Sequence, residues 1–168
     1  TGELQMMLMS RPLMTLLEQQ LFDEVTEGTQ TRMDDDTPEE MRWLVLYPKV
    51  PRAEMGALRE RFGALANLPR AAPLWLQGPL ADQLEASQSW LCADQPFVMV
   101  VQRGRLTLRC GQPQPELAAL QGALQLFVIA RAAARRVGDE VAQGRIGSER
   151  PSSWGPPSAM PSGDDPGR

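Results

Sequence analysis

Residues 96–111 decide the fold, and they read Pro-Phe-Val-Met-Val-Val-Gln-Arg-Gly-Arg-Leu-Thr-Leu-Arg-Cys-Gly. Phe97–Val101 is an unbroken apolar run, which predicts a strand that is buried on both faces. Gly104 can adopt the positive φ of a tight turn, so a hairpin turn is predicted there. Residues 106–110 then alternate apolar and polar side chains, as an edge strand with one solvated face does. The stretch therefore predicts a β-hairpin made of a central strand and an edge strand.

The segments ahead of the hairpin alternate between helix and strand patterns. Residues 4–9 form a short apolar run, which suggests either an outer strand or an arm packed on a neighbour. Apolar residues at helical spacing predict helices over residues 12–26, 52–67 and 80–92. Runs of strand-forming residues predict strands over Trp43–Tyr47 and Leu74–Leu76.

A long helix is predicted after the hairpin, over about residues 115–137. Its apolar residues cover nearly the whole circumference, which indicates a helix that is covered on more than one side. Residues 117–134 are the only candidate membrane segment of the sequence. They contain Gln121, Gln125 and Arg131 among many alanines, so they indicate a buried soluble helix without a transmembrane span.

This order of elements predicts an α/β sandwich with helices on both faces of a mixed sheet. Alternating strands and helices favour parallel strands joined by right-handed crossovers, to which the hairpin adds an antiparallel edge. Three parts are expected along the chain. They are an N-terminal arm with an amphipathic helix and an acidic loop (1–40), the α/β domain (41–138) and an irregular tail rich in Gly, Pro and Ser (139–168).

The composition limits the chemistry that the chain can perform. The sequence has no histidine, which removes the commonest general base and metal ligand. It has only two cysteines, Cys92 and Cys110, which we expect to be small buried residues, although one bridge between them stays open. Asp34–Asp36 could attract a divalent cation, but their spacing is not that of a calcium loop, so a solvated linker is favoured. The sequence therefore predicts no metal site and no cofactor.

Charge is distributed unevenly along the chain, whose net charge is −4. Residues 1–40 hold ten acidic and two basic residues, whereas residues 41–150 hold nine acidic and fourteen basic ones. The acidic segment indicates a solvated arm, or an arm that docks on a basic partner or on its own domain. Because the arginines are scattered and lack interleaved aromatic residues, no nucleic-acid partner is expected.

The central part of the chain resembles the thioredoxin-like family. Trp43–Tyr47 and the proline-containing segment 48–53 look like the first strand and active-site loop of that family. Pro96 and the hairpin look like its cis-proline, central strand and edge strand, and residues 115–136 look like its C-terminal helix. The resemblance covers about residues 41–136 and implies a thioredoxin-like α/β/α sandwich.

The chain departs from that family at the site of its chemistry. The redox reaction needs a Cys-x-x-Cys motif at the helix N-terminus, and the matching segment Val50–Glu54 contains no sulfur. No residue therefore inherits a catalytic role. Pro96 alone carries over, as a loop residue that faces a substrate or a partner, and the resemblance implies a cis peptide bond before it.

These observations predict a redox-inactive structural or assembly subunit of a larger protein complex. The expected setting is an organellar membrane complex of a plastid or mitochondrion, photosynthetic or respiratory, in which the chain is peripheral. Residues 144–168 are too polar to fold alone, so Trp154 and Met160 are candidate anchors on a partner. Thr1 is not methionine, so either a targeting peptide has been removed or the numbering begins within a longer chain.

Two other functions stay open. The first is a soluble adaptor or chaperone-like module that holds peptides in a groove near Pro51 and Pro96. The second is a thiol-dependent enzyme that acts through Cys92 or Cys110, which would need an exposed and electropositive cysteine.

Overall fold

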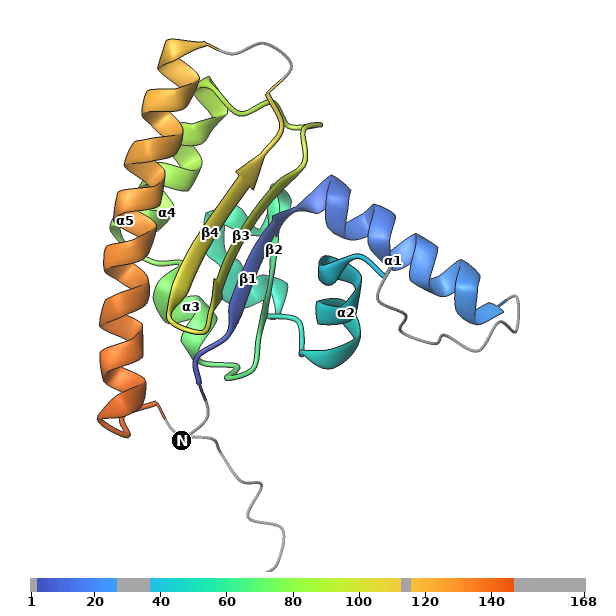
Figure 1. Cartoon of the computed structure of the whole chain (residues 1–168), viewed down its shortest axis with the longest axis horizontal. Coiled ribbons are helices and arrows are strands. Elements are labelled where there is room, and N and C mark those ends of the chain that lie inside the picture. The colour runs from blue at the N-terminus through green and yellow to red at the C-terminus, as the bar shows by residue number, and fades with distance from the viewer. Residues whose placement is uncertain (1–2, 27–36, 113–115, 147–168) are drawn as a thin grey trace, which may run out of the picture.

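The computed structural model describes residues 3–26, 37–112 and 116–146. These residues form a mixed α/β domain with one four-stranded sheet (Figure 1). In chain order the elements are β1 (Met6–Ser10), α1 (Arg11–Thr26), α2 (Glu39–Leu46), the 3-10 segment η1 (Arg52–Glu60), β2 (Phe62–Ala66), α3 (Ala71–Trp75), α4 (Pro79–Ala86), the 3-10 turn η2 (Ser87–Ser89), β3 (Phe97–Gln102), β4 (Arg105–Cys110) and α5 (Leu117–Ala142).

All strand pairs of the sheet are antiparallel. The strand order is β2-β1-β3-β4, with Leu8 of β1 opposite Ala64 of β2 on one side and Met99 of β3 on the other. The expected parallel strands with crossovers are therefore wrong. Two segments that would have supplied such strands, at residues 43–47 and 74–76, lie mostly in helices, and only Tyr47 and Leu76 lie just beyond a helix end.

The predicted hairpin is confirmed. β3 lies between β1 and β4, β4 is an outermost strand, and the two are joined by Arg103 and Gly104 at φ values of 51° and 69°. Two consecutive residues with positive φ are what a two-residue hairpin turn of type I′ requires. The expected cis bond before Pro96 is wrong, since the described residues contain no cis peptide bond.

The first apolar run is a strand, and it lies in the interior of the sheet. β1 pairs with β2 and β3, so it is neither an outer strand nor an arm packed on a neighbour. Its residues are fully buried, and alternate side chains enter the two hydrophobic clusters on opposite faces. At its end, the backbone N–H of Phe97 donates a hydrogen bond to the hydroxyl of Ser10 at 3.2 Å.

The predicted strand at Trp43–Tyr47 is wrong, because residues 39–46 form α2. Pro38 precedes the helix, and Glu39 and Glu40 lie in its first turn, where carboxylates are favourable. The helix buries Met41 and Trp43 in the same cluster as α1. Partly buried Leu44, three residues after Met41, packs on the same cluster, so the packing of this helix prevails over the strand propensity of the run.

The predicted helix over residues 52–67 is also wrong in its second half. The backbone breaks at Gly56, whose φ of 54° is not helical, and Phe62–Ala66 then form β2. The predicted strand Leu74–Leu76 lies in and just after α3. The predicted helix 80–92 is the shorter α4, which η2 follows.

Helices cover both faces of the sheet, as predicted. The larger cluster contains apolar side chains of η1, α3, α4 and α5 on one face, and the smaller one contains those of α1 and α2 on the other. α5 is held by the indole N–H of Trp75, which donates to the carbonyl of Ala130 at 3.2 Å. Gly122 lets α5 approach the ring of Trp90 closely. The predicted helices at residues 12–26 and 115–137 are confirmed as α1 and α5.

Candidate functional site

The outer side of α5 carries a continuous stripe of exposed apolar side chains, which we name the α5 stripe. Its members are between 57% and 72% exposed, and they are Leu117, Leu120, Leu124 and Val128. They are three or four residues apart, so they lie one above another on one side of the helix. The residues that α5 buries lie on the opposite side: Ala119, Leu126, Ala130, Ala133 and Val137. Within residues 3–26, 37–112 and 116–146, α5 is therefore covered on one side, whereas the sequence predicts cover on more than one.

Among the described residues, α5 is the one helix long and apolar enough to cross a membrane. Its most apolar window has a mean hydropathy of 1.5, and 22% of that window is buried. Length and composition alone are weak evidence for a span, because the core helix of a soluble protein can have both. Figure 1 shows α5 along one side of the molecule, next to β4, α3 and α4.

A groove of about 950 Å³ separates the second half of α5 from the start of β4, and we name it the edge groove. Its apolar lining includes Val101, Leu106 and Phe127. Three exposed arginines and two exposed carboxylates also line it: Arg105, Arg131, Arg135, Glu3 and Asp139. An apolar floor with charged side chains around it, most of them cationic, suits a ligand that is itself apolar on one side and polar on the other.

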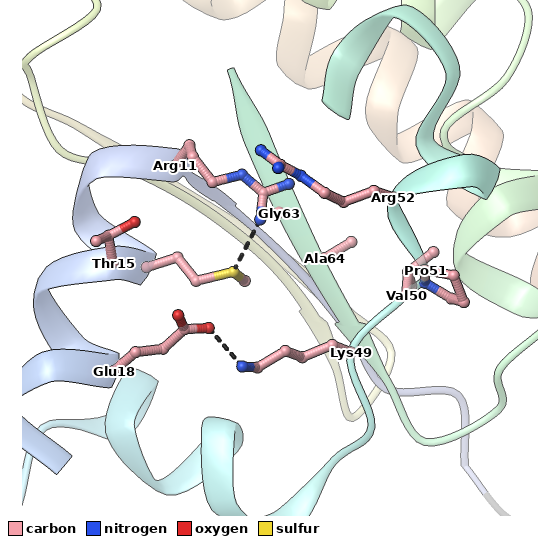
Figure 2. A pocket seen from close by; sticks show the side chains of 10 residues that line it. Arg11, Thr15, Glu18, Lys49, Val50, Pro51, Arg52, Gly63 and Ala64 are labelled. Carbon is pink, nitrogen blue, oxygen red and sulfur yellow. Dashed lines mark hydrogen bonds and ion pairs between the residues drawn. The ribbon is translucent and has the colours of Figure 1, made fainter. Parts of the chain in front are cut away.

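A second hollow of about 440 Å³ lies between α1, residues 49–52 and β2. Figure 2 shows Arg11 and Arg52 at one end of it and the ion pair of Lys49 and Glu18 at the other. The Lys49 Nζ and Glu18 Oε1 atoms are 2.5 Å apart. Glu18 is the only carboxylate among the described residues that line the hollow, and its ion pair with Lys49 means that it is not a free general base.

Arg11 acts as a clamp between the start of α1 and the region of β2. Its guanidinium donates to the backbone carbonyls of Arg59 and Phe62, at 2.8 and 2.6 Å. Burial, and then the nearby charge of Arg52, lower the pKa of Arg11. Its Nε is buried without a hydrogen-bond partner. Two of its donors thus hold the fold together, which indicates a structural role for this hollow.

The two cysteines differ in their exposure. Both are free, so the bridge that the sequence left open is not formed. Cys92 is exposed, which corrects the expectation that it is buried, and Cys110 is half-buried. Burial raises the pKa of the Cys110 thiol, so the reactive thiolate is disfavoured at neutral pH.

The four predicted partner-binding residues do not come together in one described site. Pro51 is exposed and lines the hollow beside α1. Pro96 is exposed just before β3 and does not line that hollow. Trp154 and Met160 lie outside the described residues. The exposed apolar residues that the structure does present are those of the α5 stripe. Their helical spacing is visible in the sequence, but the sequence analysis places them in a buried helix.

The part of the chain that the structure describes contains no group of three or more His, Cys, Asp and Glu side chains that could hold a metal ion. Asp34–Asp36, which the sequence analysis considered for a cation, lie outside it. Comparison of the chain with protein-family models, with curated proteins and with solved structures finds no match. The class defined by the structure is therefore a mixed α/β domain with an antiparallel sheet.

Proposed function

We propose that the protein is a non-catalytic structural or assembly subunit, which binds other protein subunits through the α5 stripe. The observation that carries this proposal is the stripe itself. Four large apolar side chains that are each more than half exposed lie in one line on a helix, and contiguous exposed apolar surface marks interaction sites. Docking a partner there would remove this surface from water, which favours association.

The finer proposal, a redox-inactive member of the thioredoxin-like family, rests on the hairpin and the C-terminal helix alone, since the expected first strand is α2 and the bond before Pro96 is not cis. These two elements are present at the expected residues. The segment that would correspond to the active-site loop, Val50–Glu54, precedes and enters η1 and contains no thiol. A location in a plastid or mitochondrial membrane complex stays a prediction.

The test is whether a complex of fixed stoichiometry depends on the α5 stripe. The tagged full chain is expressed in the cells it comes from and purified at native size, as wild type and as Leu124→Glu. The matched control is Gln125→Glu, at the neighbouring exposed position. The proposal expects one co-migrating partner with wild type and with the control, and its loss with Leu124→Glu. A free monomer in all three preparations would contradict the proposal.

A soluble adaptor that holds peptides is the second candidate, and the edge groove favours it. Such a module would bind many substoichiometric clients, whereas a structural subunit binds one partner in a constant ratio. The same purification therefore separates the two functions.

A further inference from the structure

The two outer strands of the sheet differ in how their edges are protected. The edge of β2 is closed by residues 48–50, since Val50 N–H donates to the carbonyl of Ala64 at 2.8 Å and Ala66 N–H to that of Pro48 at 3.3 Å. β4 has no neighbour beyond it in the sheet that the described residues form. An uncovered edge strand offers unpaired backbone donors and acceptors to another chain.

The register of the hairpin fixes which backbone groups of β4 point outward. Gln102 and Arg105 close the two-residue turn, and further along the N–H of Gly111 donates to the carbonyl of Pro96 at 2.8 Å. Hydrogen-bonded and non-hydrogen-bonded pairs alternate between these two points. Thr107 and Arg109 therefore bond to β3, whereas the N–H and C=O groups of Leu106, Leu108 and Cys110 face the open edge.

The two faces of this edge differ in chemistry. On one face, half-buried Leu106 lines the edge groove together with Phe127 of α5. On the other face, exposed Arg105 and Arg109 flank Thr107. Arg109 forms an ion pair with Glu40, whereas Arg105 forms none among the described residues. A strand placed beside β4 would meet an apolar surface with alternate side chains and a cationic surface with the others.

The arginines disfavour the self-pairing of two β4 strands that is centred on Thr107. In an antiparallel pair of two β4 strands centred on Thr107, Arg105 of one copy would lie opposite Arg109 of the other. Like charges directly opposite one another on a sheet are destabilising. The same arginines attract carboxylates, so the charge of the edge favours a different, acidic chain.

From these observations we propose that β4 is a site of strand addition for an extended, acidic segment of another protein. The added segment alternates apolar side chains, which enter the edge groove, with Asp or Glu side chains, which face Arg105. Its backbone bonds to the outward groups of Leu106 and Leu108, as in other cases of β-strand addition. This site is distinct from the α5 stripe and supplies the protein with a second kind of partner.

The test uses the purified full chain and a synthetic eight-residue peptide that alternates valine and glutamate. Backbone amide hydrogen exchange is measured with and without the peptide. The N–H groups of Leu106 and Leu108 should exchange fast in the free protein and at least tenfold more slowly with saturating peptide. The N–H groups of Thr107 and Arg109 should be protected in both states. Equal exchange at Leu106 and Leu108 with and without the peptide would overturn the proposal.

Two comparisons test the charge and the backbone contributions. A peptide that alternates valine and lysine should bind wild type at least tenfold more weakly than the valine–glutamate peptide does. Arg105→Glu should reverse that preference. Equal binding of the two peptides to wild type would contradict the proposal. Leu108→Pro removes an outward N–H group without removing a hydrogen bond to β3. Leu108→Ala is its matched control, and only the proline variant should lose binding of the valine–glutamate peptide. Leu124→Glu should bind the peptide like wild type, so this site and the α5 stripe can fail independently.

Discussion

The contact between α5 and Trp90 gives a sharp prediction about stability. A Cβ atom added at Gly122 would lie 2.6 Å from Cδ1 and 2.7 Å from Cε2 of the Trp90 ring. A Cβ added at Gly138, in the same helix, would meet nothing within 4 Å. Gly138→Ala is therefore the matched control for Gly122→Ala, because both changes bring the same gain in helix propensity.

The expected magnitude follows from the difference between the two variants. Replacing glycine by alanine in a helix stabilises by about 1 kcal/mol, and overpacking a fitted contact costs about 1 to 3 kcal/mol. Gly138→Ala should be more stable than wild type, and Gly122→Ala should be less stable than Gly138→Ala by about 2 kcal/mol. For a chain of this size that difference is roughly 4 to 8 °C in Tm.

The assay is thermal and guanidinium unfolding of the full chain, followed by far-UV circular dichroism. Equal m-values in the three proteins would show that the unfolded states are comparable. If Gly122→Ala matched Gly138→Ala in stability, Trp90 would not pack on α5 at Gly122. The side of α5 assigned to the core, and with it the outward direction of the α5 stripe, would then be wrong.

Further changes test the sheet, the thiols and the turn. Leu8→Ala, in the fully buried interior strand, should lower the free energy of unfolding by about 2 to 5 kcal/mol. The control Leu124→Ala should change it by less than about 0.5 kcal/mol. A small loss for Leu8→Ala in urea unfolding would contradict the interior position of β1. In labelling of single-cysteine variants, Cys92 should react before Cys110, and equal rates would contradict the burial of Cys110. The pKa of the Cys110 thiol is raised in the folded state. Its contribution to stability is therefore complete below the unfolded-state pKa and is lost as pH rises through the folded-state pKa. Cys110→Ala should accordingly lessen the fall in stability at alkaline pH. Arg103→Asn should stabilise the protein by up to about 1 kcal/mol, because asparagine tolerates a φ of 51° better than arginine does. The Tm should therefore rise, and a lower Tm would refute the turn geometry.

Local signals predicted those elements whose sequence pattern and tertiary surroundings agree. The hairpin was predicted because apolar runs, alternation and Gly104 all favour it. α1 and α5 were predicted because their apolar residues recur at helical spacing over many turns.

The sequence could not predict the elements that tertiary pairing decides. Phe62–Ala66 contains glycine and two alanines, which are poor strand formers, and Phe62 and Leu65 also continue the helical spacing of Leu58. Only pairing with β1 makes this segment a strand. Trp43–Tyr47 is composed of strand-forming residues, but the acidic first turn and the burial of Trp43 select a helix.

The candidate site was missed for a similar reason. Residues 117–128 are apolar on both sides of the helix, and the sequence alone does not say how many layers cover it. The sheet has four strands and the described elements pack against one side of α5, so the other side stays exposed. The edge strand was predicted correctly, but the edge groove depends on the distance between α5 and β4, which no local pattern encodes.

The most direct test of the central claim, that the α5 stripe binds another subunit, is site-specific photocrosslinking in the source cells. A photoreactive amino acid is placed at Leu124, in the stripe, or at exposed Gln88, in η2. The proposed function predicts one discrete crosslinked partner from position 124, in constant ratio to the chain, and none from position 88. Absence of a crosslink at position 124, or the same products from both positions, would contradict it.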